Sequence, residues 1–440
     1  MKRSWNRYHL KFILLFVALE TVAACRKAPW DLRNEGHDAE LQGRKGLSCP
    51  SFKLPKINKA PKLEVFSPET TLFGTEIEFP WSPQSGGHSL ISLYRESLRL
   101  RCEQCFGIQA CDVRINYAKV TIDNQNLTIY FDLDPKVIEV TTQPMNLDTF
   151  ESWSAVIDSL IFGAARELGS TLANSEDHRN RWSGHVNVSW PGLTQTGAHW
   201  AGKKSQDDEA ASMALLINYV IDAHNHPELA MGVLGGDIRN APPLALGNDK
   251  DRGELEKVVQ KYREKKFTST AALAKALMEA VPWSFGGRFG PARYNLINLE
   301  HLTDSLSPWW NGAPGSRLEL RGFFTPLSAS EMQTNYRIVN ARLKFLYENY
   351  VKRNQLVPFN KSRHLVSEFQ KSGMQPPVTV EMGAEVYRNY LTQAGLSPTN
   401  EGRYLRDPQV RSLVLGETAQ SLRQKPCAPV PETVNQARQQ

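Results

Sequence analysis

The stretch GTEIEF at residues 74–79 alternates carboxylates with large apolar side chains. Because neighbouring residues of a β-strand point to opposite faces, its two glutamates share one face while its isoleucine and phenylalanine share the other. The segments SGHVNVSW at 183–190 and RLELRGFF at 317–324 alternate in the same way. If the three strands lie in one sheet, the sequence predicts one apolar face and one face lined by carboxylates, an imidazole and a guanidinium. Such a face is typical of a site that binds a metal ion and a phosphate.

Two further segments extend the predicted polar face. VIEVTTQPM at 137–145 contributes a glutamate, and RYNLINLEHL at 293–302 contributes an arginine and an asparagine that share a face of their predicted strand. The polar positions of the five segments are Glu76, Glu78, Glu139, His185, Asn187, Arg293, Asn295, Glu319 and Arg321.

The order of these five segments resembles the amidoligase branch of the glutamine synthetase-like carboxylate–amine ligases. That branch has a G-x-E-x-E-F strand, a glutamate segment followed by proline, a G-x-H strand, an Arg/Asn strand and a closing strand with Glu-x-Arg. The similarity spans residues 70–326, more than half of the chain. Two positions depart from the pattern: Asn187 stands where many relatives have a second histidine, and the glutamate segment ends in TTQP.

The resemblance implies an α+β fold: a glutamine synthetase-like antiparallel sheet with a polar concave face, packed by helices, with helical additions at the C-terminus. It also implies an ATP- and Mg²⁺-dependent (or Mn²⁺-dependent) ligase that joins a carboxylate to an amine. Such enzymes first transfer the γ-phosphoryl group of ATP to the carboxylate, and the amine then attacks the acyl phosphate. The two substrates are not identified by the sequence.

The resemblance assigns a role to each polar position. Glu78 and Glu139 are expected to hold one cation, and Glu76, His185 and Glu319 a second cation that bridges the phosphates, since Mg²⁺ prefers hard oxygen ligands. Arg321 is expected to stabilise the γ-phosphate, because its charge is fixed and its guanidinium is forked. Arg293 is the second catalytic candidate. The residues expected to contact nucleotide or substrate are His185, Asn187, Asn295 and Arg321.

Structural explanations exist for each position taken alone. Glu319 and Arg321 could form a salt bridge across a wet sheet face, and His185 could be a half-buried, hydrogen-bonded histidine. A second class of function is therefore retained as an alternative: a catalytically inactive lipoprotein that uses the same fold as a binding or interaction module. Nucleotide binding that depends on Mg²⁺ distinguishes the two.

The N-terminus predicts an envelope protein. Four basic residues among the first eleven precede the apolar run FILLFVAL at 12–19, and the small-residue sequence VAAC ends at Cys25. This resembles a bacterial lipoprotein signal, in which residues 1–24 are removed and Cys25 is lipidated. Arg26 after the cysteine favours sorting to the outer membrane. An ordinary secretory signal or a short membrane anchor is the alternative, although the run is shorter than the roughly 20 residues that a membrane span needs.

A location in the cell envelope suggests peptides or cell-wall peptide stems as substrates. It also suggests that the protein contacts the membrane through its lipid anchor. The net charge of +6 is mild for 440 residues. Nucleic-acid binding usually requires a clustered basic face. We therefore expect no nucleic-acid partner.

Six cysteines are present. Apart from Cys25 they form an odd set: Cys49, Cys102, Cys105, Cys111 and Cys427. Because the envelope permits disulfides, we expect one or two bridges and at least one remaining thiol. A zinc site that includes the C-x-x-C pair at 102–105 is the alternative, although no second such pair exists to complete it.

The predicted organisation has five parts: a signal peptide (1–24), a tether rich in Lys and Pro (25–68), a catalytic domain (69–326), a helical part packed on that domain (327–425) and a polar tail (426–440). Residues 70–145 are expected to be rich in strands, including one over 94–101. Capping patterns predict helices that begin near Asp148 and Ser328. Other helices are expected over 206–223, 251–281, 361–371 and 383–394.

Overall fold

The computed structural model describes residues 49–50, 69–80, 87–134, 137–168, 183–190, 192–193, 206–229, 249–280, 296–303, 317–359, 380–405 and 408–416. The chain divides into two units, Met1–Ser48 and Cys49–Gln440, and every described residue belongs to the second. Several predictions fall outside the described residues: the signal peptide, the lipidation site Cys25, the helix over 361–371, Arg293, Asn295 and Cys427.

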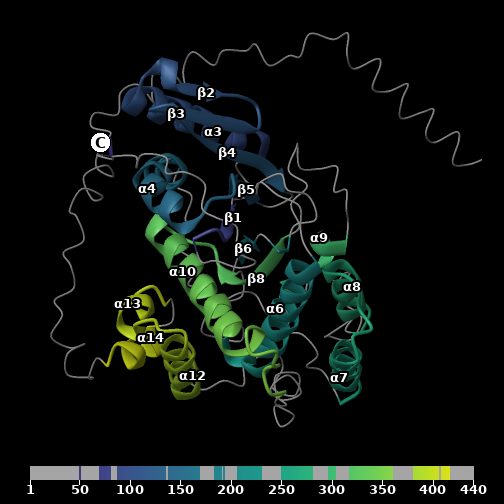
Figure 1. Cartoon of the computed structure of the whole chain (residues 1–440). Helices are drawn as coiled ribbons and strands as arrows, with labels where there is room; N and C mark the ends of the chain where they lie inside the picture. Colours follow the sequence, from purple (N-terminus) through teal and green to yellow (C-terminus); the bar gives the residue numbers. More distant parts are fainter. Residues whose placement is uncertain are drawn as a thin grey trace, which may run out of the picture. The chain divides into compact units, whose positions relative to one another are not determined.

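An open antiparallel sheet forms the centre of the described part of the chain (Figure 1). Its order is β2-β3-β4-β5-β1-β6-β8-β7, and every neighbouring pair is antiparallel. The segment 74–79 lies in the central strand β1, between β5 and β6. The prediction of an α+β fold with a large antiparallel sheet is confirmed. The strands are β1 (Leu72–Pro80), β2 (Cys111–Val113), β3 (Tyr117–Ile122), β4 (Gln125–Asp134), β5 (Val137–Thr142), β6 (Ser183–Ser189), β7 (Ile297–Asn298) and β8 (Leu318–Phe324).

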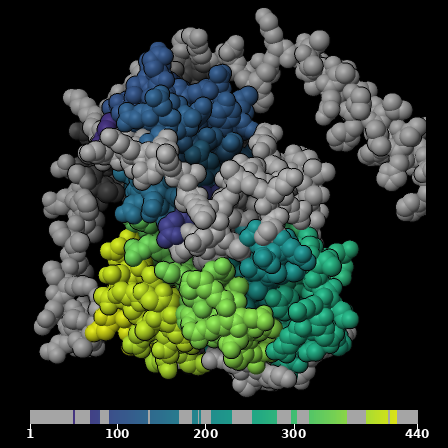
Figure 2. All heavy atoms as spheres, in the orientation of Figure 1, coloured from purple at the N-terminus to yellow at the C-terminus, as the bar shows by residue number. Residues whose placement is uncertain are grey.

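Helices and helical turns make up most of the remaining described residues. Helix α10 contacts both α6 and α12, and Figure 2 shows the light-green residues that include α10 at the surface between the teal and the yellow helices. The helical elements are α3 (Gly87–Phe106), η3 (Ile108–Ala110), α4 (Leu147–Ile157), η4 (Asp158–Phe162), α5 (Gly163–Glu167), α6 (Gln206–Asn225), α7 (Asp249–Arg263), α8 (Thr270–Ala280), α9 (Glu300–Thr303), α10 (Ala329–Leu346), η7 (Tyr347–Val351), α12 (Val380–Gln393), α13 (Pro398–Gly402) and α14 (Pro408–Leu415). Within the described ranges, no helix combines the length and the apolar character needed to cross a bilayer.

The alternation read from the sequence sets the two faces of the sheet. Its apolar positions are buried in one continuous core, and they include Phe73, Ile77, Val186, Val188, Leu318 and Leu320. The polar positions of the same strands lie on the opposite face, since adjacent residues of a strand point in opposite directions.

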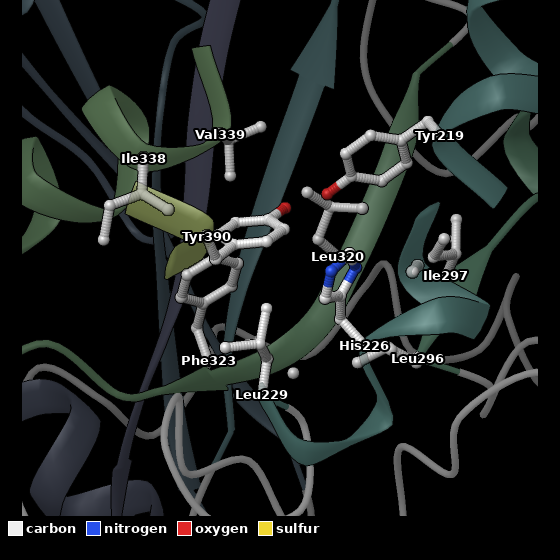
Figure 3. A pocket seen from close by; sticks show the side chains of 12 residues that line it. Tyr219, His226, Leu229, Leu296, Ile297, Leu320, Phe323, Ile338, Val339 and Tyr390 are labelled. Atoms are coloured by element: carbon white, nitrogen blue, oxygen red, sulfur yellow. The ribbon is translucent and has the colours of Figure 1, made fainter. Parts of the chain in front are cut away.

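A cavity of about 50 Å³ lies between strand β8 and residues of helices α10 and α12 (Figure 3). Leu320 and Phe323 of β8 line it, together with Ile338 of α10 and Tyr390 of α12. The lining is mostly hydrocarbon, so this cavity belongs to the apolar side of the sheet.

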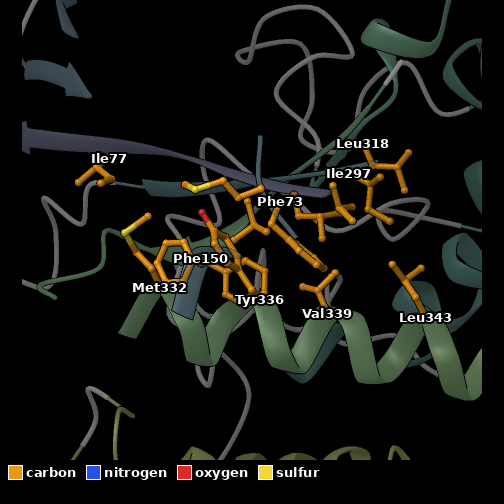
Figure 4. Close-up of a cluster of buried hydrophobic side chains, with 14 of the residues drawn as sticks. Phe73, Ile77, Phe150, Ile297, Leu318, Met332, Tyr336, Val339 and Leu343 are labelled. Atoms are coloured by element: carbon orange, nitrogen blue, oxygen red, sulfur yellow. The ribbon is translucent and has the colours of Figure 1, made fainter. Parts of the chain in front are cut away.

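Helix α10 packs its apolar stripe against the sheet (Figure 4). The ring of Tyr336 stacks on Phe73 with a centroid distance of 5.0 Å, and its hydroxyl lies 2.6 Å from Thr75 Oγ1. The helix begins as predicted: the Ser328 side chain accepts a hydrogen bond from Glu331 N, at 3.2 Å. Such a cap satisfies a backbone donor that the first helical turn leaves open.

Three details of the secondary structure differ from the prediction. The helix expected over 251–281 is two helices, α7 and α8, which are separated by residues 264–269. Residues 94–101, expected as a strand, lie inside α3, because Tyr94, Leu98 and Cys102 recur every four residues and form one buried stripe. The next helix, α4, is capped by Asn146, which accepts a hydrogen bond from Thr149 N at 2.8 Å. The predicted cap near Asp148 was therefore two residues late.

Both cysteine bridges involve α3. Cys49 is bonded to Cys105, and Cys102 is bonded to Cys111. The prediction of disulfides is confirmed, and the zinc alternative is wrong because every cysteine of the C-x-x-C region is already in a bridge. One bridge also ties residue 49, within the predicted tether, to helix α3.

The C-terminal helices occupy two packing environments. Helix α10 shares the core of the sheet, whereas α12, α13 and α14 gather around a smaller cluster that includes Tyr387, Leu391, Leu405 and Val410. Leu229 and Ile338 extend into this smaller cluster from the main body. The predicted helical part 327–425 therefore contributes to both.

Candidate metal centre

Strand register brings the predicted polar residues together. Glu76 of β1 lies directly opposite His185 of β6, and Asn187 of β6 lies opposite Glu319 of β8. In an antiparallel pair, residues directly opposite each other point to the same face. Three segments that are about a hundred residues apart in the sequence therefore contribute to one spot on the polar face.

A bulge between β6 and β8 lies next to this spot. Gly184 pairs with Phe323 while Val186 pairs with Leu320, so His185 faces two residues of β8, Arg321 and Gly322. The strands approach closely here: a Cβ atom on Gly184 would lie 2.2 Å from the carbonyl oxygen of Phe324. Bulges commonly re-aim a side chain. The glycine before His185 is therefore required by the backbone of β8.

The imidazole of His185 lies among three carboxylates. Its Nδ1 is 2.6 Å from Glu76 Oε2 and 3.2 Å from Glu319 Oε1, and its Nε2 is 3.8 Å from Glu78 Oε1. His185, Glu76 and Glu319 are only 3%, 7% and 4% exposed. Buried charges are costly unless they are paired, so this arrangement needs compensation within the site.

The Glu76–His185–Glu319 group could hold a metal ion. One ligand atom from each residue lies within 4.8 Å of the others. The Nε2 atom of His185 is buried and has no hydrogen-bond partner among the residues that the structure describes, although a buried polar atom normally has one. Two carboxylates and an imidazole are a donor set that suits a divalent cation such as Mn²⁺. The residues present therefore fit a metal ion.

The pKa values of Glu76 and His185 are shifted by the interaction of the two groups with each other and with their neighbours. Burial and the Glu319 carboxylate act to raise the pKa of Glu76, but the charge and hydrogen bond of His185 outweigh them and hold this pKa below its ordinary value. Burial and the Arg321 guanidinium act to lower the pKa of His185, but Glu76 and Glu319 outweigh them and raise it. The positive charge that His185 can carry therefore offsets part of the carboxylate charge, a role that a bound cation would also fill.

Glu319 lies within hydrogen-bond distance of three side chains outside the group. Its Oε1 accepts a hydrogen bond from Arg321 Nη1, and its Oε2 lies 2.8 Å from Asn298 Nδ2 and 3.1 Å from His301 Nε2. Burial acts to raise the pKa of Glu319, but His301, His185 and Arg321 hold it well below its ordinary value. Glu319 is therefore kept as a carboxylate.

Glu78 and Glu139 lie beside this group in a separate row. They face each other across β1 and β5, and Asp132 of β4 lies opposite Glu139. Like charges directly opposite each other on neighbouring strands are destabilising, so the row favours a cationic partner. The row approaches the Glu76–His185–Glu319 group through Glu78. Asp132 was missed from the sequence, although its strand had been recognised.

Asn187 contacts protein groups on both sides of its amide. Its Nδ2 donates to Glu76 Oε1 at 3.0 Å, and its Oδ1 accepts from Arg317 Nε at 3.0 Å. The asparagine here serves as a hydrogen-bonding partner of a predicted ligand.

Sequence reasoning missed three further polar residues of the site: Asn298, His301 and Arg317. The first two belong to the segment 293–302 that had been singled out for Arg293 and Asn295, which lie outside the described residues. The sequence Asn-Leu-Glu-His at 298–301 could have indicated these two residues. The short strand β7 is followed at once by helix α9, so Asn298 and His301 both lie next to strand β8. Arg317 immediately precedes β8, two residues from Glu319.

No model of a known protein family matches the chain, and comparison with curated protein sequences finds no match either. The case for function therefore depends on the geometry of the polar face.

Proposed function

We propose that this protein is an ATP- and Mg²⁺-dependent (or Mn²⁺-dependent) carboxylate–amine ligase of the amidoligase type, with a glutamine synthetase-like sheet. The observation that carries the proposal is the buried Glu76–His185–Glu319 group, whose ligand atoms lie within 4.8 Å of one another on the polar face of an antiparallel sheet. The adjacent row of carboxylates, Glu78, Glu139 and Asp132, supports a second cation. The order of the segments along the chain is the one expected from the resemblance.

The reaction assigned here has two steps. A carboxylate oxygen of the first substrate attacks the γ-phosphorus of ATP, the bond to the β-γ bridging oxygen breaks, and ADP leaves. The amine of the second substrate then attacks the acyl carbon, loses a proton, and inorganic phosphate departs. Divalent cations, when bound, would neutralise charge on the phosphate oxygens.

The residues of the chain hold and orient the reacting groups. Glu76, His185 and Glu319 would hold the cation that contacts the phosphates, and Glu78 with Glu139 the cation near the acyl acceptor. Arg321 lies beside Glu319 and within 3.5 Å of His185 Nδ1, which places a fixed positive charge at the edge of the metal group. A guanidinium there stabilises charge that develops on the transferred phosphoryl group. Arg293, Asn295 and Asn187 are the remaining candidates for contact with nucleotide or substrate.

A location in the bacterial cell envelope is part of the proposal. We infer lipidation at Cys25 from the basic and apolar start and the V-A-A-C sequence, with sorting to the outer membrane. The substrates proposed for this location are peptides or cell-wall peptide stems, and nucleic acid is not among the proposed partners.

Calorimetry of ATP binding tests the proposed function. The full chain, purified in detergent, is titrated with ATP in EDTA and again in Mg²⁺ or Mn²⁺, alongside Glu319→Gln. We expect ATP affinity only with the cation, and its loss in the variant. Equal ATP affinity with and without the cation, or no ATP binding in either condition, contradicts the ligase assignment.

One observation favours the alternative, an inactive envelope lipoprotein that retains the fold. Both oxygens of Glu319 already have partners within the protein, as expected for a polar network that only stabilises a sheet. The Nε2 atom of His185 favours a binding function instead. It has no hydrogen-bond partner among the described residues, although a purely structural network would be expected to supply one. The titration above separates the two functions.

A further inference from the structure

Arg317 connects the two carboxylates of the candidate metal group through intermediate side chains. It precedes β8 and is partly buried. Its Nε donates to Asn187 Oδ1 at 3.0 Å, and its Nη2 lies 3.1 Å from His301 Nε2. Asn187 leads to Glu76 and His301 leads to Glu319.

The connection through Asn187 is directional. Its amide oxygen accepts from Arg317 while its amide nitrogen donates to Glu76 Oε1 at 3.0 Å. With Oε1 held in this way, Oε2 of Glu76 faces His185 at 2.6 Å. A residue at 187 must therefore accept and donate at the same time. Aspartate can only accept, and leucine can do neither.

The connection through His301 is less directional. The same ring nitrogen lies 3.1 Å from both Arg317 Nη2 and Glu319 Oε2, and one nitrogen cannot accept from the first and donate to the second at once. Asn298 also holds this oxygen, at 2.8 Å. Glu319 therefore has a second donor and depends less on Arg317 than Glu76 does.

We propose that Arg317 is a positioning residue that acts through Asn187 to orient Glu76 as a cation ligand, and that Asn187 acts as a relay in place of a second ligand. This inference rests on the proposed function, because it takes the Glu76–His185–Glu319 group as the cation site. Residues that orient metal ligands in this way typically change metal affinity by about 10- to 100-fold when they are replaced.

The test is the affinity of the full chain for Mn²⁺ alone, measured by calorimetry. Arg317→Met and Asn187→Leu are each expected to weaken Mn²⁺ binding by about 10- to 100-fold. Asn187→Asp keeps the contact with Arg317 but removes the donor to Glu76, and it is expected to weaken binding as well. The matched control is Arg353→Met, because this exposed arginine follows η7 and its loss removes the same charge.

The double variant identifies the route. If Arg317 acts through Asn187, the double variant Arg317→Met with Asn187→Leu is expected to bind Mn²⁺ about as weakly as either single variant, because shared interactions are not additive. A purely structural role would lower the temperature of unfolding in EDTA without changing the Mn²⁺ affinity of the folded protein.

The outcomes separate this inference from the proposed function. Failure of the wild-type chain to bind Mn²⁺ overturns the cation site and the inference with it. Tight Mn²⁺ binding by the wild type, with unchanged affinity in Arg317→Met and Asn187→Leu, overturns the inference alone. If Arg317→Met does not fold, the two Asn187 variants decide the question.

Discussion

Two buried groups of charges in this molecule differ in how completely their members are paired. Asp222 of α6 and Arg342 of α10 are 1% and 2% exposed, and both oxygens of Asp222 accept hydrogen bonds from the guanidinium. The rings of Phe345 and Tyr390 lie 4.6 and 4.1 Å from that guanidinium. In the Glu76–His185–Glu319 group, by contrast, two carboxylates share one imidazole, and the Nε2 atom of that imidazole has no hydrogen-bond partner among the described residues.

This difference separates a structural ion pair from a candidate binding site. Burial alone does not indicate function, because both groups are buried. Two carboxylates around one imidazole, and a ring nitrogen without a hydrogen-bond partner among the described residues, are the features expected of a site that could accommodate a cation. The pair Asp222–Arg342 joins helices, whereas the Glu76–His185–Glu319 group joins strands on a polar face.

The largest expected effect comes from breaking the helix pair. Arg342→Met leaves the Asp222 carboxylate buried without its guanidinium partner, although His226 Nδ1 remains 3.5 Å away, so we expect the free energy of unfolding to fall by about 3–5 kcal/mol. Denaturant unfolding in EDTA measures this change. Mn²⁺ affinity of the folded variant is expected to equal that of the wild type. Weaker Mn²⁺ binding would show that the two groups are energetically coupled and that Asp222–Arg342 is not a purely structural pair.

A second large effect is expected on the apolar side of β8. Leu320→Ala removes a buried side chain from the core and should cost about 2–5 kcal/mol of stability. Its neighbours Glu319 and Arg321 remain in place, so we expect the folded variant to retain ATP turnover. Turnover lost at temperatures where the variant is fully folded would show that the two faces of β8 have been assigned incorrectly.

Arg321→Lys tests the opposite face of the same strand. A compact ammonium cannot reproduce a planar fork against a phosphate, so we expect a loss of about 2–4 kcal/mol in transition-state stabilisation. The ratio kcat/KM for ATP turnover measures it, with thermal unfolding as the control for folding. Full turnover in this variant would remove Arg321 from the catalytic assignment.

Cation binding at the Glu76–His185–Glu319 group should stabilise the fold. At a Mn²⁺ concentration about 100-fold above Kd, we expect a gain of about 2.7 kcal/mol in the free energy of unfolding. Glu319→Gln should abolish the gain, whereas Arg342→Met, although less stable, should keep it. An equal gain in wild type and Glu319→Gln would place the cation elsewhere.

The strand pattern was sufficient to predict the centre of the fold. Alternation in three segments predicted the apolar and polar faces, and the structure brings Glu76, His185 and Glu319 together as expected. Alternation fixes which face a side chain occupies, and an antiparallel register then fixes its neighbour. The prediction failed at α3, where Leu98 and Leu100 alternate like strand residues although the buried stripe has helical spacing.

The surroundings of the site could not be predicted in the same way. Asn298 and His301 reach Glu319 only because β7 pairs with β8, and two residues are too short a strand to be recognised by alternation. Asp132 belongs to the acidic row through the register of β4 with β5, which the sequence of a single strand does not specify. Arg317 lies just outside its strand, where the pattern of faces ends.

The disulfide between Cys49 and Cys105 would shorten the distance over which the polar face can move from the lipid anchor proposed at Cys25. If Cys25 carries the lipid, about 24 residues separate it from the bridged Cys49, compared with about 44 residues to position 69. The maximum span of the shorter segment is about 80 Å and that of the longer one about 150 Å. The bridge would therefore reduce the volume open to the polar face around the proposed anchor about sixfold.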